Sequence, residues 1–93
     1  MENSLTFPKD DAVEESEIIN KNNVTLFNDS NHTFDEVTNQ LMVAIHCDEK
    51  TAFKLAFLVD RNGSAIVFGG SVDDCVRVSS ILESIGLKTE ISI

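Results

Sequence analysis

The chain has 93 residues, of which 42% are hydrophobic, and its 16 acidic side chains against 7 basic ones give a formal charge of -9. This length suits one small domain with a single core. So negative a chain is a poor match for nucleic acid or for an anionic membrane surface, because both need clusters of Lys and Arg, and it favours a cationic partner or ligand.

Two further features bear on where the protein works. The cysteines, Cys47 and Cys75, lie far apart and form no Cys-x-x-Cys pair. The first residues lack the basic and apolar regions of a signal peptide, and no apolar run approaches the roughly 18 residues of a membrane span. We therefore expect a cytoplasmic protein with reduced thiols.

The first 22 residues differ from the rest of the chain. They carry six acidic residues and two lysines, which is -4 of the total charge of -9, and their apolar residues follow no steady period. This composition predicts a flexible acidic tail over residues 1–22, with a short helix near 12–19 as an alternative. The core domain is then expected over residues 23–93.

From Asn23 onward, apolar runs and capping residues predict regular elements. The β-rich run 24–27 indicates a first strand. The residues from Thr33 to Glu36 have the pattern of a capping box, and apolar residues recur behind it at helical spacing, so a helix is expected over about 34–46. Asp48 is placed to cap a second helix, which Asn62 and Gly63 would end through a left-handed residue.

The last third of the chain predicts two strands and a helix. The apolar run 65–68 indicates a strand that Gly69 and Gly70 would break. Ser71 would cap a third helix ended by Gly86, and apolar and polar residues then alternate from 87 to 93, as in a half-buried strand. The order β-α-α-β-α-β predicts a two-layer α+β domain, with a three-stranded antiparallel sheet packed against three helices.

Catalysis by a nucleophile has little support in the sequence. A small hydrolase would need His32 or Cys47, but His46 and Cys47 are neighbours at a helix end, so their side chains point apart. Cys75 lies on an apolar helix face and is most simply a core residue. The two histidines and two cysteines lack the spacing of a zinc site, and Gly69-Gly70 lacks the rest of a phosphate-binding loop. We expect a protein without enzymatic activity, cofactor or metal.

Six polar residues, Asn28 to Thr33, separate the first strand from the first helix. They are more than a connector needs. Asn28 and Asp29 follow the strand directly, where chain ends project side chains into clefts, but an Asx turn would explain them equally. The apolar face of the second helix ends at Asp60, which is either simply solvated or the polar rim of a pocket.

The stretch from Asn28 to Val37 resembles the first loop of the ClpS family, adaptors that feed N-degron substrates to the AAA+ unfoldase of the Clp protease. The family pattern there is Asn-Asp-Asp, a few residues, then Thr, an apolar position, an acid and Val. The ending "LESIGLKTEI" resembles the Gly-Leu turn into the family's last strand, and the match spans roughly residues 24–93. Matches in the second helix and after it are Ala52, Leu55 or Ala56, Val59, Asp60, Gly63 and Ala65.

The resemblance implies the same fold and a binding function. In the family a small pocket takes an N-terminal Leu, Phe, Tyr or Trp side chain, and the rim binds the free α-amino group. Carried over, the α-amine ligands are Asn28, Asp29 and Asp60, where Asp60 stands in place of the family's His. The implied pocket walls are Leu26, His32, Phe34, Val37, Ala56 and Val59.

The resemblance also implies partners. Asp73 and Arg77 lie near the positions by which the family docks on the N-terminal domain of a ClpA- or ClpC-like unfoldase. The expected protein is thus a monomeric, bacterial-type adaptor that delivers N-degron substrates for proteolysis. The alternative is a ClpS-fold interaction module that docks on a partner but has lost recognition of the free α-amine.

Overall fold

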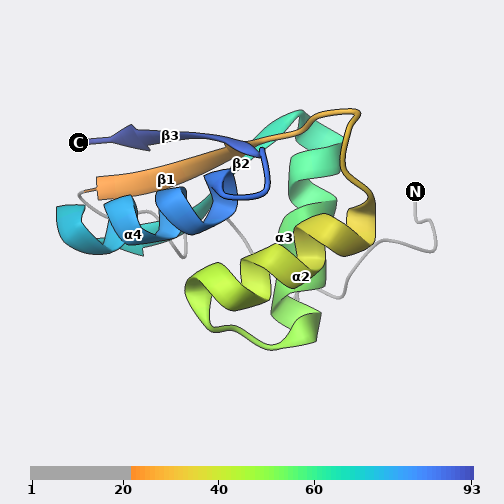
Figure 1. Cartoon of the computed structure of the whole chain (residues 1–93), viewed down its shortest axis with the longest axis horizontal. Helices are drawn as coiled ribbons and strands as arrows, with labels where there is room; N and C mark the ends of the chain where they lie inside the picture. Colours follow the sequence, from red (N-terminus) through yellow and green to blue (C-terminus); the bar gives the residue numbers. More distant parts are fainter. Residues whose placement is uncertain (1–21) are drawn as a thin grey trace, which may run out of the picture.

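Three strands and three helices follow one another in the order that the sequence predicts (Figure 1). The computed structural model describes residues 22–93, so the expected tail, apart from Asn22, and the alternative helix near 12–19 lie outside the described residues. The elements are β1 (Asn22–Phe27), α2 (Phe34–Ile45), α3 (Glu49–Asn62), β2 (Ser64–Gly70), α4 (Val72–Glu83) and β3 (Lys88–Ser92). The α+β prediction is confirmed.

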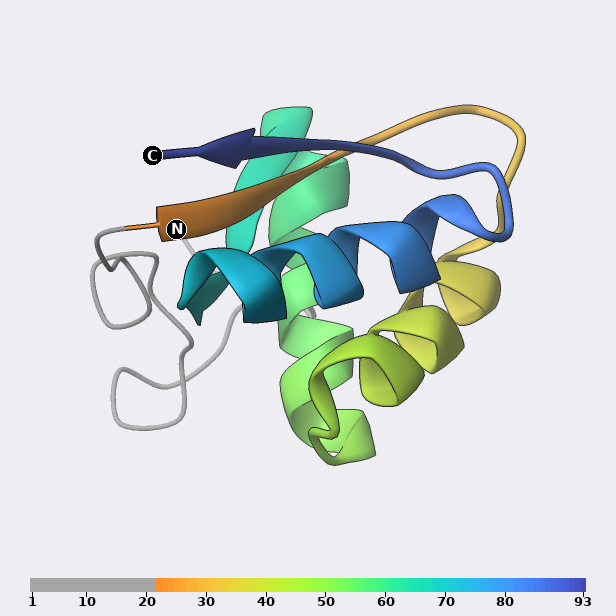
Figure 2. The ribbon, with the colours of Figure 1, turned by 60° about the vertical axis from the view of Figure 1, so that its left-hand side comes forward.

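The strands form one antiparallel sheet with β1 in the middle, in the order β2-β1-β3. The register between β1 and β2 shifts by one residue between Val24 and Thr25, a β-bulge that adds local twist. The helices lie on one side of this sheet, with α4 running beneath it and α2 crossing α3 (Figures 1 and 2). The domain thus has the predicted two layers.

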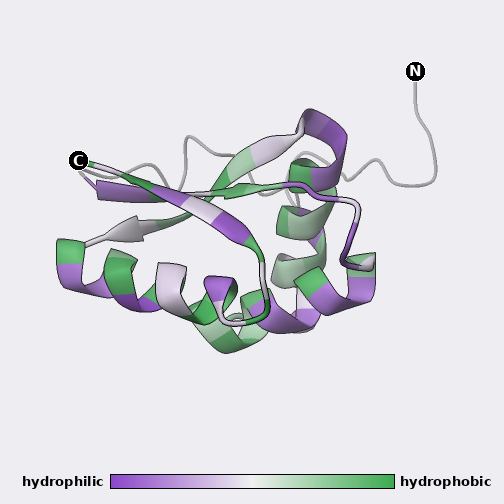
Figure 3. Ribbon diagram, turned by 45° about the horizontal axis from the view of Figure 1, so that its top comes forward, coloured by the Kyte–Doolittle hydropathy of each residue, from purple (hydrophilic) through white to green (hydrophobic). Residues whose placement is uncertain are grey.

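The core lies between the sheet and the helices. Val24 and Leu26 of β1 and Ala65 and Val67 of β2 alternate with more exposed residues, because side chains of a strand point to opposite faces in turn. Polar and apolar residues likewise alternate along the helices, whose apolar sides face inward (Figure 3). The helices contribute these buried apolar residues: Leu41, Ala44, Ala52, Leu55, Ala56, Phe57, Val59, Cys75, Val78 and Leu82.

Local side-chain chemistry fixes where the helices begin. At the start of α2, the Thr33 hydroxyl accepts a hydrogen bond from the Glu36 amide (3.1 Å), and the Thr33 amide donates to Glu36 Oε1 (2.7 Å). This is the predicted capping box. Asp48 caps α3 and Ser71 caps α4 in the predicted way, each by accepting from the amide three residues on. These caps satisfy amides that have no partner within the helix.

The helix ends follow the prediction less closely. Gly63 ends α3 in the left-handed region, with φ of 86°, as predicted. α2 ends at Ile45, and His46 adopts the left-handed conformation at its cap. α4 ends at Glu83, three residues before Gly86, and the Gly86 amide closes the following turn by donating to the Glu83 carbonyl (2.9 Å).

One strand prediction was wrong. Gly69 and Gly70 do not break β2 but form its last two residues, paired with Asn23 and Asn22 of β1. Pairing with the central strand holds the glycines extended, so tertiary context outweighs their weak preference for strands. β1 also begins at Asn22, one residue before the expected domain boundary.

Within residues 22–93, no helix combines the length and the apolar character needed to cross a membrane. In the same residues, no three His, Cys, Asp or Glu side chains gather where they could hold a metal ion.

Candidate functional site

A small hollow opens where β1 and α3 end. The Asn28 amide donates to the Gly63 carbonyl (2.9 Å), which holds the loop after β1 against the end of α3. The hollow has a volume of about 70 Å³. It is therefore sized for a side chain rather than for a drug-like ligand, whose pockets are about 300–1,000 Å³. Its lining residues are Asn28, Asp29, His32, Phe34, Val37, Ala56, Val59 and Asp60.

Two helices supply the apolar walls. Ala56 and Val59 lie three residues apart on α3 and are each 2% exposed, so they share one helix face. Phe34 and Val37 lie at the same spacing in the first turn of α2. The Phe34 ring meets the Phe53 ring edge to face, with centroids 4.9 Å apart and planes at 65°. This packing holds the Phe34 wall in place.

The rim is polar and acidic. Asn28 and Asp29 come from the loop after β1, and Asp60 follows the wall residue Val59 on α3. Asp60 is exposed to solvent, so its carboxylate is accessible to a ligand. An apolar hollow with acceptors at its mouth suits a ligand that joins an apolar group to a cation.

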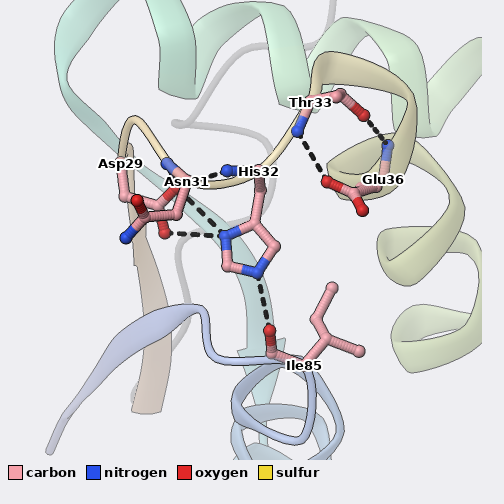
Figure 4. Close-up of polar contacts among 6 residues, drawn as sticks. All are labelled: Asp29, Asn31, His32, Thr33, Glu36 and Ile85. Atoms are coloured by element: carbon pink, nitrogen blue, oxygen red, sulfur yellow. Dashed lines mark hydrogen bonds and ion pairs between the residues drawn. The ribbon is translucent and has the colours of Figure 1, made fainter.

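Asp29 is fixed by hydrogen bonds inside its own loop (Figure 4). Its Oδ1 atom accepts from the backbone amides of Asn31 (3.0 Å) and His32 (3.1 Å), which makes an Asx turn. Its Oδ2 atom lies 2.9 Å from Nδ1 of the His32 ring. Burial opposes ionisation of Asp29, but these hydrogen bonds outweigh it and lower the pKa of the carboxyl below its ordinary value.

His32 reaches a second partner far away in the chain. Its Nε2 atom lies 2.6 Å from the carbonyl oxygen of Ile85, in the turn that follows α4 (Figure 4). The hydrogen bond to the Ile85 carbonyl and that to Asp29 raise the pKa of His32 above its ordinary value. The ring therefore connects the loop at the hollow to the turn after α4, 53 residues further along the chain.

The structure brings together eight of the nine residues expected at the site. Leu26 is the exception: none of its surface is exposed, it belongs to the core, and it does not line the hollow. His32 lines the hollow, but its ring nitrogens are engaged in polar contacts, so it is not simply an apolar wall.

The expected docking residues are separated in role. Asp73 is exposed in the first turn of α4. Arg77 instead extends to α2, where its Nη1 atom donates to the Ala44 carbonyl (3.0 Å) and its Nη2 atom lies 3.8 Å from Oδ1 of Asp74. Arg77 thus helps to join α4 to the end of α2.

Neither cysteine has the lowered thiol pKa of a catalytic nucleophile. Burial raises the pKa of the Cys47 thiol and of the Cys75 thiol above the ordinary value, whereas a reactive thiolate needs a lowered pKa. Cys75 has no exposed surface, as expected for a core residue.

Sequence reasoning missed three contributors to the site. The carbonyls of Gly63 and Ile85 and the ring of Phe53 act through tertiary contacts with the loop and with Phe34. The available signal for the first was the predicted end of α3 at Gly63, because carbonyls at a helix end lack partners within the helix. Nothing in the sequence pointed to Ile85, which is 53 residues from His32.

The apolar hollow with its acidic rim thus lies on a two-layer domain of one three-stranded sheet and three helices. The chain belongs to the ClpS family: the family model described as ATP-dependent Clp protease adaptor protein ClpS matches residues 17–90. Among solved structures, Agrobacterium tumefaciens ClpS2 bound to L-phenylalaninamide aligns with a TM-score of 0.67 and 22% identity over 76% of this chain and 93% of that chain. This likeness agrees with the fold.

Curated relatives include much larger proteins. The E3 ubiquitin-protein ligase ubr-1 of Caenorhabditis elegans is 40% identical over 52 residues, which are 56% of this chain and 2% of the ligase. The E3 ubiquitin-protein ligase UBR2 of Mus musculus is 32% identical over 82 residues, or 84% of this chain and 5% of the ligase. The chain thus spans only a few per cent of the length of these ligases.

Proposed function

We propose that this protein recognises substrate proteins by a free N-terminal residue with a bulky hydrophobic side chain. The side chain enters the hollow between α2 and α3, and the α-ammonium group binds Asn28, Asp29 and Asp60 at the rim. The observation that carries this proposal is the convergence of these three polar residues on the same hollow as Phe34, Val37, Ala56 and Val59.

The two halves of the site contribute different properties. Burial of a Leu or Phe side chain contributes about 1.5–3 kcal/mol, which gives affinity but little choice between a first residue and an internal one. The rim supplies that choice, because an internal amide is uncharged and cannot satisfy acceptors arranged for an ammonium. The ligand named for the ClpS2 structure, L-phenylalaninamide, combines an aromatic side chain with a free α-amine, which supports this division.

A peptide panel tests the proposal. Peptides that differ only in their first residue (Phe, Leu, Ser or Asp) are titrated against the protein by fluorescence anisotropy. We expect Phe-first and Leu-first peptides to bind at least about tenfold more tightly than Ser-first, as burial of about 1.5–3 kcal/mol implies. Equal affinities across the panel would contradict the proposal that the hollow selects the first side chain.

We further propose that the captured substrate is delivered to a Clp AAA+ unfoldase through the face of α4 that bears Asp73. The family description supports this destination. Pull-down with the isolated N-terminal domain of a ClpA-like or ClpC-like unfoldase tests it, with Asp73→Lys as the variant expected to reduce capture and Asp35→Lys, in the first turn of α2, as a control for the change in charge.

The similarity to E3 ubiquitin-protein ligases favours a second destination. In this case the same hollow would capture the same N-terminal residues, but the captured substrate would pass to ubiquitin ligation instead of a Clp unfoldase. Both destinations predict the same result for the peptide panel, but they predict different results for the pull-down with the unfoldase domain. Tight binding of Phe-first peptides without capture by either unfoldase domain would favour the ligase route.

A further inference from the structure

Both ring nitrogens of His32 face groups that can only accept hydrogen bonds. Nδ1 lies 2.9 Å from Oδ2 and 3.1 Å from Oδ1 of Asp29, and Nε2 lies 2.6 Å from the carbonyl oxygen of Ile85 (Figure 4). A neutral imidazole carries one N–H, so it can donate to only one of these partners. The imidazolium carries two and satisfies both.

We propose that the His32 imidazolium is a positioning residue for α-amine recognition, which holds the Asp29 carboxylate at the hollow by tying its loop to the turn after α4. This inference rests on the proposed function and adds to it a residue that acts through Asp29. It differs from the expectation that His32 forms an apolar wall of the pocket.

The loop from Asn28 to Thr33 shows why such a tie matters. Its first residue is held by the hydrogen bond from the Asn28 amide to Gly63, and its last by the capping box of Thr33 and Glu36. Between these points, the His32 ring gives the long-range hydrogen bond to Ile85. The hydrogen bonds of Asp29 to Asn31 and to the His32 amide are local, so they shape the loop without fixing it to the rest of the domain.

The His32 ring also packs closely against the turn after α4. A Cβ atom added at Gly86 would lie 3.5 Å from Cε1 and 3.7 Å from Nε2 of His32, in ordinary van der Waals contact. The ring is thus packed against the turn whose carbonyl it meets, and its side chain is only 13% exposed. The ring is held on one side by Asp29 and on the other by residues 85–86.

The charges around the ring favour its protonated form. Asp29 contacts it directly, Glu36 of α2 adds negative charge nearby, and Asp60 of α3 lines the same hollow. The hydrogen bonds to Ile85 and Asp29 raise the pKa of His32 in agreement with this geometry. One opposing effect is present, because an imidazolium repels an incoming ammonium. The proposal requires that fixing Asp29 outweigh this repulsion, which solvent screens at a rim.

Two variants separate the two hydrogen bonds of the ring. His32→Asn places an amide donor near the position of Nδ1, and His32→Gln places one near that of Nε2, so each keeps one partner and neither titrates. His46→Asn is the matched control, because it removes the other described histidine at a left-handed position that Asn tolerates. Affinity for a Phe-first peptide is measured for all four proteins from pH 5.5 to 8.5.

We expect the wild type to bind about 5- to 20-fold more tightly than either His32 variant at pH 5.5. This ratio should shrink toward one as His32 loses its proton, while the His46→Asn protein matches the wild type throughout. Deprotonation of the peptide amine, with a pKa near 7.7–8, affects every protein equally and cancels in the ratio.

The outcomes distinguish this inference from the proposed function. A wild type that binds Phe-first peptide with the same affinity and pH profile as both His32 variants would overturn the inference and leave the function standing. A ratio that grows with pH would also overturn it, since charge repulsion would then dominate. A wild type that binds no better to Phe-first than to Ser-first peptide at any pH would overturn the function, and the positioning role with it.

Discussion

The backbone amide of Asn28 donates a 2.9 Å hydrogen bond to the carbonyl oxygen of Gly63, and this contact joins the end of β1 to the end of α3. It brings Asp29, just after the strand, into the same hollow as Asp60, near the end of the helix. Asp60 reaches the hollow from the last turns of α3, and Asp29 reaches it from the loop residue that follows this hydrogen bond. The contact between Asn28 and Gly63 therefore sets where the two acidic residues of the rim meet.

The first prediction concerns Asp60. Asp60→Asn keeps the shape of the side chain and removes its charge, so the ammonium loses a charge-assisted hydrogen bond at an exposed site. We expect binding of a Phe-first peptide to weaken about 3- to 10-fold, which corresponds to about 0.7–1.4 kcal/mol. Isothermal titration calorimetry measures the change directly.

Glu90→Gln is the matched control for Asp60→Asn. It also removes one negative charge, but Glu90 lies on β3 and does not line the hollow. The control should leave the affinity unchanged. If both substitutions weaken binding equally, net charge governs the affinity and Asp60 has no specific contact with the amine.

The second prediction concerns the size of the pocket. Ala56 lines the hollow, so Ala56→Met should fill part of its volume of about 70 Å³. Large first residues should lose more affinity than small ones, and the preference for Phe over Leu should fall by about 3- to 10-fold, which corresponds to about 0.7–1.4 kcal/mol. Ala52→Met is the control, because Ala52 is fully buried and does not line the hollow. It should lower stability without changing this preference.

The third prediction concerns the capping box at the start of α2. Thr33→Ala removes the hydroxyl that accepts from the Glu36 amide, so we expect the free energy of unfolding to fall by about 0.5–2 kcal/mol. Urea denaturation followed by circular dichroism measures it. Thr33→Ser keeps the hydroxyl and should stay within a few tenths of a kcal/mol of the wild type. Equal losses in the two variants would show that the cap contributes nothing.

The fourth prediction concerns pH and stability. The pKa of His32 is raised in the folded protein, so its contribution is complete below the unfolded value of about 6.5 and is lost as pH rises through the folded value. The pKa of Asp29 is lowered, so its contribution is present above about 3.9 and is lost as pH falls through the folded value. The excess stability of the wild type over His32→Asn should therefore be greatest between about pH 4 and 6.5.

Denaturation of both proteins at pH 3, 5.5 and 9 measures this excess. It should be smaller at pH 3 and at pH 9 than at pH 5.5. An excess that stays constant across the three values would mean that His32 stabilises the fold by packing alone, without the ion pair to Asp29.

Features of short range could be read from the sequence. The capping box of Thr33 and Glu36 and the left-handed end at Gly63 depend on residues within a few positions, so residue type was sufficient to predict them. The family resemblance then supplied the polar rim, and Asn28, Asp29 and Asp60 do gather at one hollow.

Features of long range could not be read in this way. Gly69 and Gly70 are extended because β1 pairs with them, and Leu26 is buried because it lies with Val24 on the face of β1 toward the helices. The partners of His32 and Arg77 are the backbone carbonyls of Ile85 and Ala44. Every residue has such a carbonyl, so residue type does not single out these two as acceptors. Only the packing of α4 against the loop and α2 selects these two.

The central claim is that the rim recognises a free α-amine. One measurement tests it most directly: the affinity of the protein for a Phe-first peptide compared with the same peptide acetylated at its N-terminus, at pH 6.5. Acetylation removes the charge and leaves the side chain intact. The account predicts that the free peptide binds at least about tenfold more tightly, which is about 1.4 kcal/mol. Equal binding of the two peptides would contradict it.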